Sequence, residues 1–177
     1  MASTTLDDLI TERRIVPDTK VDIAESRIGA VVRAGAPKPD ISSVDALLRT
    51  LLDASSIAYS PSLSGVYLST DLFPRLGIAD ALKGKSRRIE DVRVGDAVAR
   101  GDAEIGFQQI SELIHVSGIQ YVGPLPAAVQ KTTTISAGIA ADARNAASAQ
   151  VLIRFLTSRA ASSVMRRHGL DPVSTQP

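Results

Sequence analysis

Serine residues gather in one short segment of the sequence, and their hydroxyls could hold an anion. The segment SPSLSGVY places Ser60, Ser62 and Ser64 around a proline, with Gly65 directly after them. A helix is expected to begin near Gly65 or Val66, and the first turn of a helix offers unpaired N–H groups and the positive end of its dipole. An anion can be bound there without any lysine or arginine. A serine-rich turn with a helix cap has the same pattern.

Two adjacent glutamines stand where an apolar run, EIGF, gives way to a helix start, ISEL. Successive side chains on a strand point to opposite faces, so Gln108 and Gln109 cannot both point the same way while the strand stays regular. Both are candidate ligand-binding residues, with Gln109 expected to face the ligand and Gln108 expected to pack behind it. An ordinary polar strand exit is the alternative.

A third loop, IEDV, is expected to present backbone N–H groups at a helix start. Asp91 is expected to cap a helix that runs through Arg100 and ends at Gly101. The N–H groups of Val92 and Arg93 would then point the same way, which makes Val92 a candidate ligand-binding residue. An ordinary capped helix is again the alternative.

The sequence contains no convincing catalytic motif. It has no cysteine and only two histidines, which excludes cysteine nucleophiles and zinc sites of the Cys/His type. The GKS at residues 84–86 resembles the end of a phosphate-binding loop, but Ala79 stands where that motif needs its first glycine. His115 has no Ser/Asp arrangement at the spacing that nucleophilic catalysis needs. We expect no metal and no cofactor, and binding is favoured over catalysis.

The composition indicates a folded protein that does not bind nucleic acid. The chain has 177 residues, of which 44% are hydrophobic, and 20 basic residues nearly balance 19 acidic ones. It has no basic stripe interleaved with aromatics and no apolar run near the roughly 20 residues that cross a bilayer. The first residues, MASTTLDDLITERRIV, lack the pattern of a secretory signal. If the chain is complete as given, it is expected to stay in the cytoplasm.

The elements expected to position the three loops alternate between strands and helices. Strands are expected at 28–32, 56–59, 87–89, 104–107, 119–126 and 132–140. Helices are expected after Thr4 or Thr5, at 42–53, from about 65, at 91–100, at 111–116, and on both sides of a break at Ser158. This alternation is typical of an α/β fold built on a largely parallel sheet, in which ligands bind at the carboxyl ends of the strands.

The succession SIAYS, SGVY, LFPRLGIAD, EDV, VARGDAEIGFQQISEL, GIQYVGPLP, SAGIAA and LIRFLTS…GLDPV resembles a known family. These motifs are similar to those of bacterial extracellular solute-binding proteins of the molybdate-binding type, the type II periplasmic binding proteins that serve ABC transporters. The resemblance implies an α/β fold with one complete lobe, an incomplete second lobe and two inter-lobe crossings. Lobe one would comprise residues 1–32 and 132–177, and lobe two residues 36–128.

In that family two lobes close on an anion, which is held by neutral donors and helix N-termini. The matching positions here are Ser64, Gly65, Val92 and Gln109, and Ser62 joins them from the serine segment. Gln109 falls where molybdate binders commonly have a tyrosine, which puts molybdate in doubt. An amide both donates and accepts, so an organic carboxylate would suit the site as well as an oxyanion.

The resemblance further implies a small anionic solute and ABC transporter membrane subunits as partners, in the periplasm. The chain matches the family without the beginning of lobe one, which would leave an open sheet edge and apolar surface. A longer protein or a homodimer would cover them, and these residues alone are expected to bind weakly or not at all. Two alternatives are an aconitate-type isomerase, with Glu112 or His115 as the base, and a cytosolic ligand-sensing domain.

Overall fold

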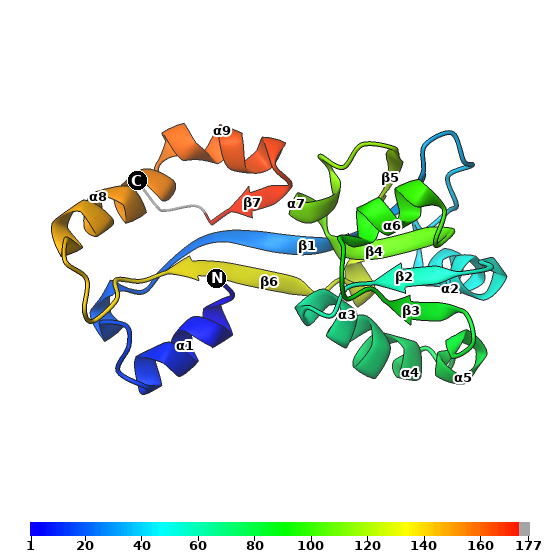
Figure 1. Cartoon of the computed structure of the whole chain (residues 1–177), viewed down its shortest axis with the longest axis horizontal. Coiled ribbons are helices and arrows are strands. Elements are labelled where there is room, and N and C mark those ends of the chain that lie inside the picture. The colour runs from blue at the N-terminus through cyan, green and yellow to red at the C-terminus, as the bar shows by residue number, and fades with distance from the viewer. Residues whose placement is uncertain (174–177) are drawn as a thin grey trace. The chain divides into compact units, whose positions relative to one another are not determined.

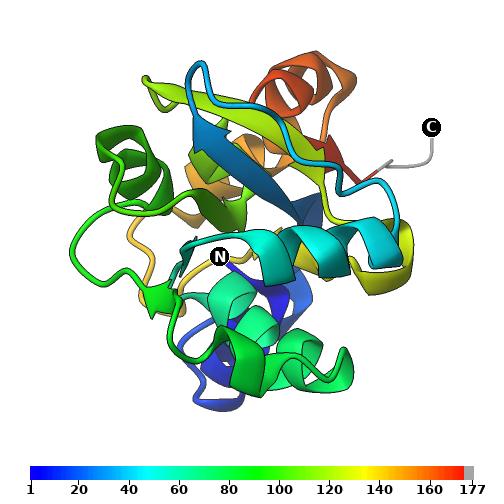
Figure 2. The same cartoon turned by 90° about the vertical axis from the view of Figure 1, so that its right-hand side faces the viewer.

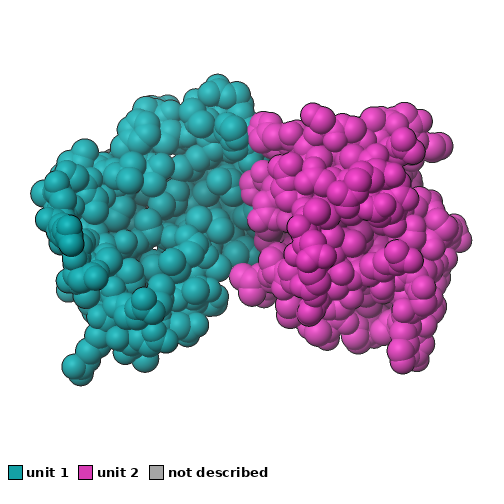
Figure 3. All heavy atoms as spheres, in the orientation of Figure 1, with its two compact units in different colours: residues 1–26, 132–177 teal, residues 27–131 magenta. Residues whose placement is uncertain are grey.

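The computed structural model describes residues 1–173, and these form two compact units (Figures 1 and 3). One unit contains residues 1–26 and the chain from Thr132 onward; the other contains residues 27–131. The chain enters the second unit inside strand β1, after Ser26, and leaves it after Lys131. We call them the outer unit and the central unit, after their places in the sequence.

The central unit is built on a sheet of mixed strand direction. Its strands, in their order across the sheet, are β3 (Ser86–Arg88), β2 (Ile57–Tyr59), β4 (Ile105–Gln109), β1 (Val21–Arg33) and β5 (Ile119–Pro124). β2 runs parallel to β3 and β4, whereas β1 runs antiparallel to β4 and β5. The prediction of a largely parallel sheet is therefore only partly correct. Strand β1, through which the chain enters this unit, is antiparallel to both of its neighbours, β4 and β5.

Helices cover both faces of this sheet, and the strands alternate their side chains between them. On one face Ile57, Ile105 and Phe107 pack with α2 (Val44–Asp53) and α5 (Ala79–Leu82). Figure 2 turns this unit toward the viewer, with α2 in cyan. A second cluster occupies the other face, formed mainly by strand residues and by helices α6 and α7. Its buried members are Val31, Ala58, Val94, Val98, Ala103 and Leu113. Helix α6 spans Val94–Arg100 and α7 spans Ile110–Leu113.

The helix after the serine segment is continuous from residue 63 to residue 75 and contains a π turn. It comprises α3 (Leu63–Tyr67), the π segment η2 (Leu68–Leu72) and α4 (Phe73–Arg75). Within the π segment the N–H of Phe73 donates to the carbonyl of Leu68, five residues back. Pro74 follows directly, and since proline cannot donate and crowds the preceding turn, the wider turn accommodates it. The helix begins at Leu63, two or three residues earlier than predicted.

The ends of the two helices α2 and α6 show which residues cap them. Ser43 caps α2 by accepting from the N–H of Ala46 at 3.1 Å, and Gly101 ends α6 in the left-handed region with φ +85°. The prediction that Asp91 caps α6 is wrong, because the helix begins at Val94 with Arg93 as its N-cap. Residues 91 and 92 form a bend before it.

The outer unit packs helices around strands β1, β6 and β7. Strand β6 spans Thr132–Ala137 and β7 spans Leu170–Pro172. The helices of this unit are α1 (Ser3–Thr11), η1 (Pro17–Thr19), α8 (Ala146–Leu156) and α9 (Arg159–Arg167). The short helix η3 (Ala127–Val129) belongs to the central unit. Strands β6 and β7 both pair with β1. Met1 exchanges two backbone hydrogen bonds with Ser136 of β6, at 2.8 and 3.0 Å, so α1 starts directly after this pairing. The predicted cap at Thr4 or Thr5 is therefore misplaced.

One helix of the outer unit exposes apolar side chains. Val151, Leu152 and Phe155 on α8 are 67%, 56% and 55% exposed, and Ile153 is the buried residue of that helix. Exposed apolar side chains that lie together often mark a place where a protein meets another surface.

The predicted break at Ser158 is confirmed, since Ser158 is the N-cap of α9.

Candidate functional site

Three serine hydroxyls converge where β2 ends and α3 begins. Ser60 follows the last residue of β2, Ser62 is the N-cap of α3, and Ser64 lies in its first turn. The Oγ atoms are 2.7 Å apart for Ser60 and Ser62, 3.1 Å for Ser60 and Ser64, and 3.3 Å for Ser62 and Ser64. We call these residues the serine cluster. Because each hydroxyl donates one hydrogen and can rotate, all three could turn toward a shared acceptor.

The cluster is held together by a close approach that requires glycine at position 65. A Cβ built on Gly65 would lie 1.7 Å from the carbonyl oxygen of Ser60 and 3.0 Å from the ring of Tyr59. The first turn of α3 therefore lies directly against the end of β2. Ser60 and Ser64 are almost completely buried, whereas Ser62 is exposed, so Ser62 is the hydroxyl that solvent reaches.

Gln109 ends the neighbouring strand at the same edge of the sheet. Tyr59 of β2 pairs with Phe107 of β4, so the serine cluster and Gln109 lie at the same end of two adjacent, parallel strands. We call this the carboxyl edge of the central sheet. Gln109 is the last residue of β4 and the N-cap of α7, lies opposite Ile28 of β1, and is 8% exposed.

Gln108 uses both ends of its amide inside the central unit. Its Oε1 accepts from the N–H of Val94 at 3.0 Å, and its Nε2 donates to a carboxylate oxygen of Glu112. The amide thus links β4 to the first residue of α6 and to α7. This arrangement agrees with the packing role expected of Gln108, and it gives Glu112 a hydrogen-bond donor that the sequence did not reveal.

Val92 comes after the edge strand β3, which pairs in parallel with β2, the strand before the serine cluster. Its side chain is 38% exposed and lines a hollow of about 290 Å³ together with Arg88, Asp91 and Arg100. Since β3 is the edge strand and β2 separates it from β4, Val92 and Gln109 follow strands that are not neighbours. The structure therefore places Ser62, Ser64, Gly65 and Gln109 at the ends of the adjacent strands β2 and β4, and Val92 after β3, on the other side of β2.

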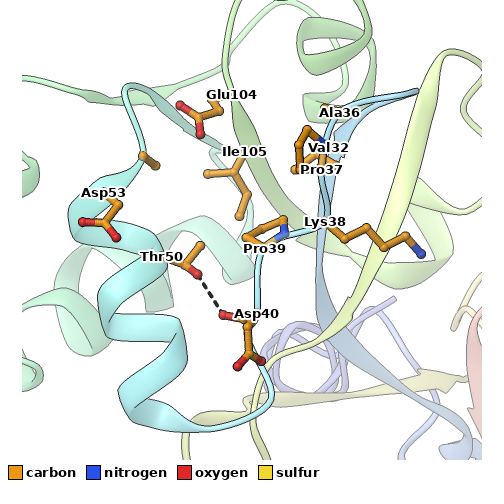
Figure 4. A pocket seen from close by; sticks show the side chains of 11 residues that line it. Val32, Ala36, Pro37, Lys38, Pro39, Asp40, Thr50, Asp53, Glu104 and Ile105 are labelled. Carbon is orange, nitrogen blue, oxygen red and sulfur yellow. Dashed lines mark hydrogen bonds between the residues drawn. The ribbon is translucent and has the colours of Figure 1, made fainter.

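A separate pocket of about 370 Å³ lies at the opposite end of β4, where that strand begins with Ile105 (Figure 4). Its apolar floor includes Val32 and Ala54, and its rim includes Asp53 and Glu104. The Glu104 carboxylate accepts from the N–H of Ser55 at 2.7 Å, outside the set of lining residues. This pocket shares no residue with the serine cluster or with either glutamine.

The residues that the structure describes contain no group of three or more His, Asp or Glu placed to hold a metal ion. Within residues 1–173, no helix has both the length and the apolar character of a membrane span. The features available for ligand recognition at the carboxyl edge are therefore hydroxyls, amides, backbone N–H groups and nearby charged side chains.

Replacing Gln108 by methionine is expected to lower the free energy of unfolding by about 2 kcal/mol. The change keeps an unbranched side chain of similar length but leaves the N–H of Val94, which is fully buried, without its acceptor. Urea unfolding followed by circular dichroism would measure the difference. Gln120→Met, at a half-buried position of β5, is the matched control and should change stability by less than about 0.5 kcal/mol. Equal losses in both variants would contradict the structural role of Gln108.

Comparison with known proteins identifies relatives along nearly the whole chain. Residues 1–171 match the family model described as bacterial extracellular solute-binding protein. A curated protein from Pseudomonas sp., named aconitate isomerase, is 44% identical over 177 residues, which are all of this chain and 68% of that protein.

Solved structures share the fold at low sequence identity. The periplasmic molybdate-binding protein of Azotobacter vinelandii aligns with a TM-score of 0.72 and 20% identity, over 99% of this chain and 76% of its own. The substrate-binding domain assigned to a molybdenum ABC transporter of Clostridium difficile aligns with a TM-score of 0.73 and 20% identity, over 96% and 73% of the two chains. The predicted type II periplasmic-binding-protein fold is thereby confirmed.

Proposed function

The chain belongs to the bacterial extracellular solute-binding protein family, and from that premise we propose that it binds a small organic anion with several carboxylates. The proposed site is the carboxyl edge of the central sheet, at Ser62, Ser64, Gly65 and Gln109. The convergence of three serine hydroxyls within 3.3 Å of one another at a helix start is the observation that carries the proposal.

The chemistry of this edge suits an anion that is bound by neutral donors. Hydroxyls and helix N–H groups supply hydrogen bonds and partial positive charge without a buried cation. Hydrogen bonds to a charged acceptor are roughly twice as strong as those between neutral groups. An anion that draws the serine hydroxyls away from one another would therefore replace weak bonds with stronger ones.

Two observations favour a polycarboxylate over molybdate. Gln109 supplies an amide where molybdate binders commonly have a tyrosine, and its Nε2 group can donate to a carboxylate oxygen. The relative that is 44% identical over the whole chain carries the name of an enzyme of aconitate, a tricarboxylate. We infer that this chain takes ligands of the same chemical class.

We further propose a setting and a lobe division for this binding. Like its family, the protein would act in the periplasm and present its solute to the membrane subunits of an ABC transporter. Residues 36–128 would act as one lobe, and residues 1–32 and 132–177 as the other. We also propose a homodimer formed through the exposed apolar side chains of α8, and the mass of the protein in solution would test it.

Titration of the ¹⁵N-labelled chain with trans-aconitate, followed by NMR, tests the proposed site even if affinity is weak. We expect the amide signals of Ser62, Ser64, Gly65 and Gln109 to shift with added ligand. Ser62→Ala should weaken binding about tenfold, because one hydrogen bond to a charged acceptor is lost.

Ser117→Ala is the matched control, since Ser117 is an exposed serine in the turn before β5, away from the serine cluster. It should leave binding unchanged. Molybdate and sulfate serve as comparison ligands. Shifts confined to the pocket of Figure 4, or the absence of any shift with aconitate, would contradict the proposed site.

A second function, isomerisation of a small polycarboxylate, is favoured by the hydrogen bond from Gln108 to Glu112. A carboxylate fixed in this way next to the carboxyl edge could remove a proton from a methylene group of the ligand and return it to another carbon. In a propene tricarboxylate this moves the double bond and exchanges one isomer for the other, with no cofactor. The 44% identity to aconitate isomerase agrees with this chemistry.

A further inference from the structure

The last residues of the central unit, 125–130, are fastened to two elements of the proposed site. We call them the exit segment, because the chain leaves this unit after Lys131. Leu125 and Val129 of the exit segment are buried in one cluster with Ile28 of β1 and with Leu68, which follows α3 in the same continuous helix. The exit segment therefore packs on the face of the sheet that this helix also covers.

One anchor of the exit segment is Gln130, which holds β1 at Ile28. Its Oε1 accepts from the N–H of Ile28 and its Nε2 donates to the carbonyl of Ile28, both at 2.9 Å. We call these two bonds the clamp. Because they use both backbone groups of Ile28 on the side away from β4, Ile28 and Gln109 form a pair without hydrogen bonds between them, and their side chains lie next to each other on one face. The clamp therefore fixes the residue that lies beside Gln109.

The other anchor is Tyr67, on the helix that follows the serine cluster. Its hydroxyl donates to the carbonyl of Val129 at 2.8 Å and accepts from Nη2 of Arg75 at 3.0 Å. Tyr67 lies three residues after Ser64, so the two are on the same side of α3, and the π segment begins only after Tyr67. Val129 directly precedes Gln130, so the two anchors are adjacent in the exit segment.

We propose that the exit segment is a strap that holds the two halves of the site, the serine helix and the strand end at Gln109, at the spacing that the ligand requires. This inference rests on the proposed function and adds a conformational control of the same site. A ligand that bonds to both halves favours the closed clamp, and the closed clamp favours binding to the same extent, because such coupling is reciprocal. Tyr67 and Gln130 are positioning residues, which act through α3 and through Ile28.

Amide hydrogen exchange of Ile28, followed by NMR on the whole chain, reports opening of the clamp, because a side-chain acceptor protects this N–H. Saturating trans-aconitate should slow the exchange of Ile28 about 5- to 10-fold more than that of Ala34. The N–H of Ala34 donates to the carbonyl of Gly118 just past the far end of β1, and it corrects for overall stabilisation by the ligand.

Equal slowing of the two amides, while the signals of Ser62 and Ser64 shift with ligand, would overturn the strap and leave the proposed binding site in place. A wild-type chain in which trans-aconitate shifts neither serine signal would overturn both proposals.

Gln130→Met and Tyr67→Phe should each weaken trans-aconitate binding by that same factor, about 5- to 10-fold, and the double variant should bind no more weakly than either. A strap released at one anchor no longer joins the two halves, so releasing the second anchor has no further effect. Gln120→Met and Tyr121→Phe, at half-buried positions of β5, are the matched controls and should change the affinity by less than twofold.

Losses that multiply in the double variant, or equal losses in the control variants, would overturn the strap. Should a variant fail to fold, the exchange of Ile28 in the wild-type chain still decides.

Discussion

Replacing Gly65 by alanine is expected to lower the free energy of unfolding by about 3 kcal/mol or more and to abolish ligand binding at the serine cluster. The new Cβ would lie 1.7 Å from the Ser60 carbonyl oxygen, which is backbone and cannot rotate away. The end of β2 and the first turn of α3 must then separate, and Ser60 and Ser64 are drawn apart. Urea unfolding and the aconitate titration measure the two effects.

Gly84→Ala is the control for this prediction. A Cβ at Gly84 would have no heavy atom within 4 Å, and its φ is not in the left-handed region. The change should be neutral or stabilise the protein by up to about 1 kcal/mol, because it restricts the unfolded chain. If Gly65→Ala were as stable as Gly84→Ala, the close approach of β2 and α3 would be wrong.

Replacing Glu112 by glutamine is expected to reduce isomerisation of aconitate by about 10²- to 10⁴-fold, if the protein catalyses it, while binding is retained. Glutamine has the same shape, and its Oε1 can still accept the hydrogen bond from Gln108, so the site keeps its geometry. What is lost is the base. Proton NMR in D₂O follows both isomers and exchange of the methylene protons.

Glu104→Gln is the matched control, since Glu104 is also an exposed carboxylate that accepts hydrogen bonds, but it lies at the opposite end of β4. It should leave turnover unchanged. Turnover that survives in Glu112→Gln would remove Glu112 as the base. A wild-type chain that binds aconitate without turnover or exchange would reject the isomerase function and leave the binding function in place.

Much of the candidate site could be predicted from local sequence, because its parts are local. Ser60, Ser62 and Ser64 lie within one turn of one another along the chain, so the strand-to-helix step that brings their hydroxyls together is visible in SPSLSGVY. Gln109 could be placed at a strand end for the same reason. Asp91 misled the prediction, since a capping residue type does not specify which of several adjacent residues begins the helix.

Contacts between distant residues could not be predicted in this way. The bond from Gln108 to Val94 joins residues 14 apart, and the clamp of Gln130 on Ile28 joins residues 102 apart. No local sequence pattern predicts either of these hydrogen bonds, because each depends on which strands become neighbours. The same holds for Tyr121, whose ring lies close to Gly29 only because β5 pairs with β1.

The amino-acid sequence by itself determined the α/β class, the positions of most helices and strands, and the serine and glutamine motifs. These depend on local propensity, periodicity and caps, which act over a few residues. Only the tertiary structure decided the mixed direction of the sheet and the order of its strands, which places Gln109 and Val92 on either side of the serine cluster. Those features follow from strand order and register, which are set by contacts between residues far apart in the chain.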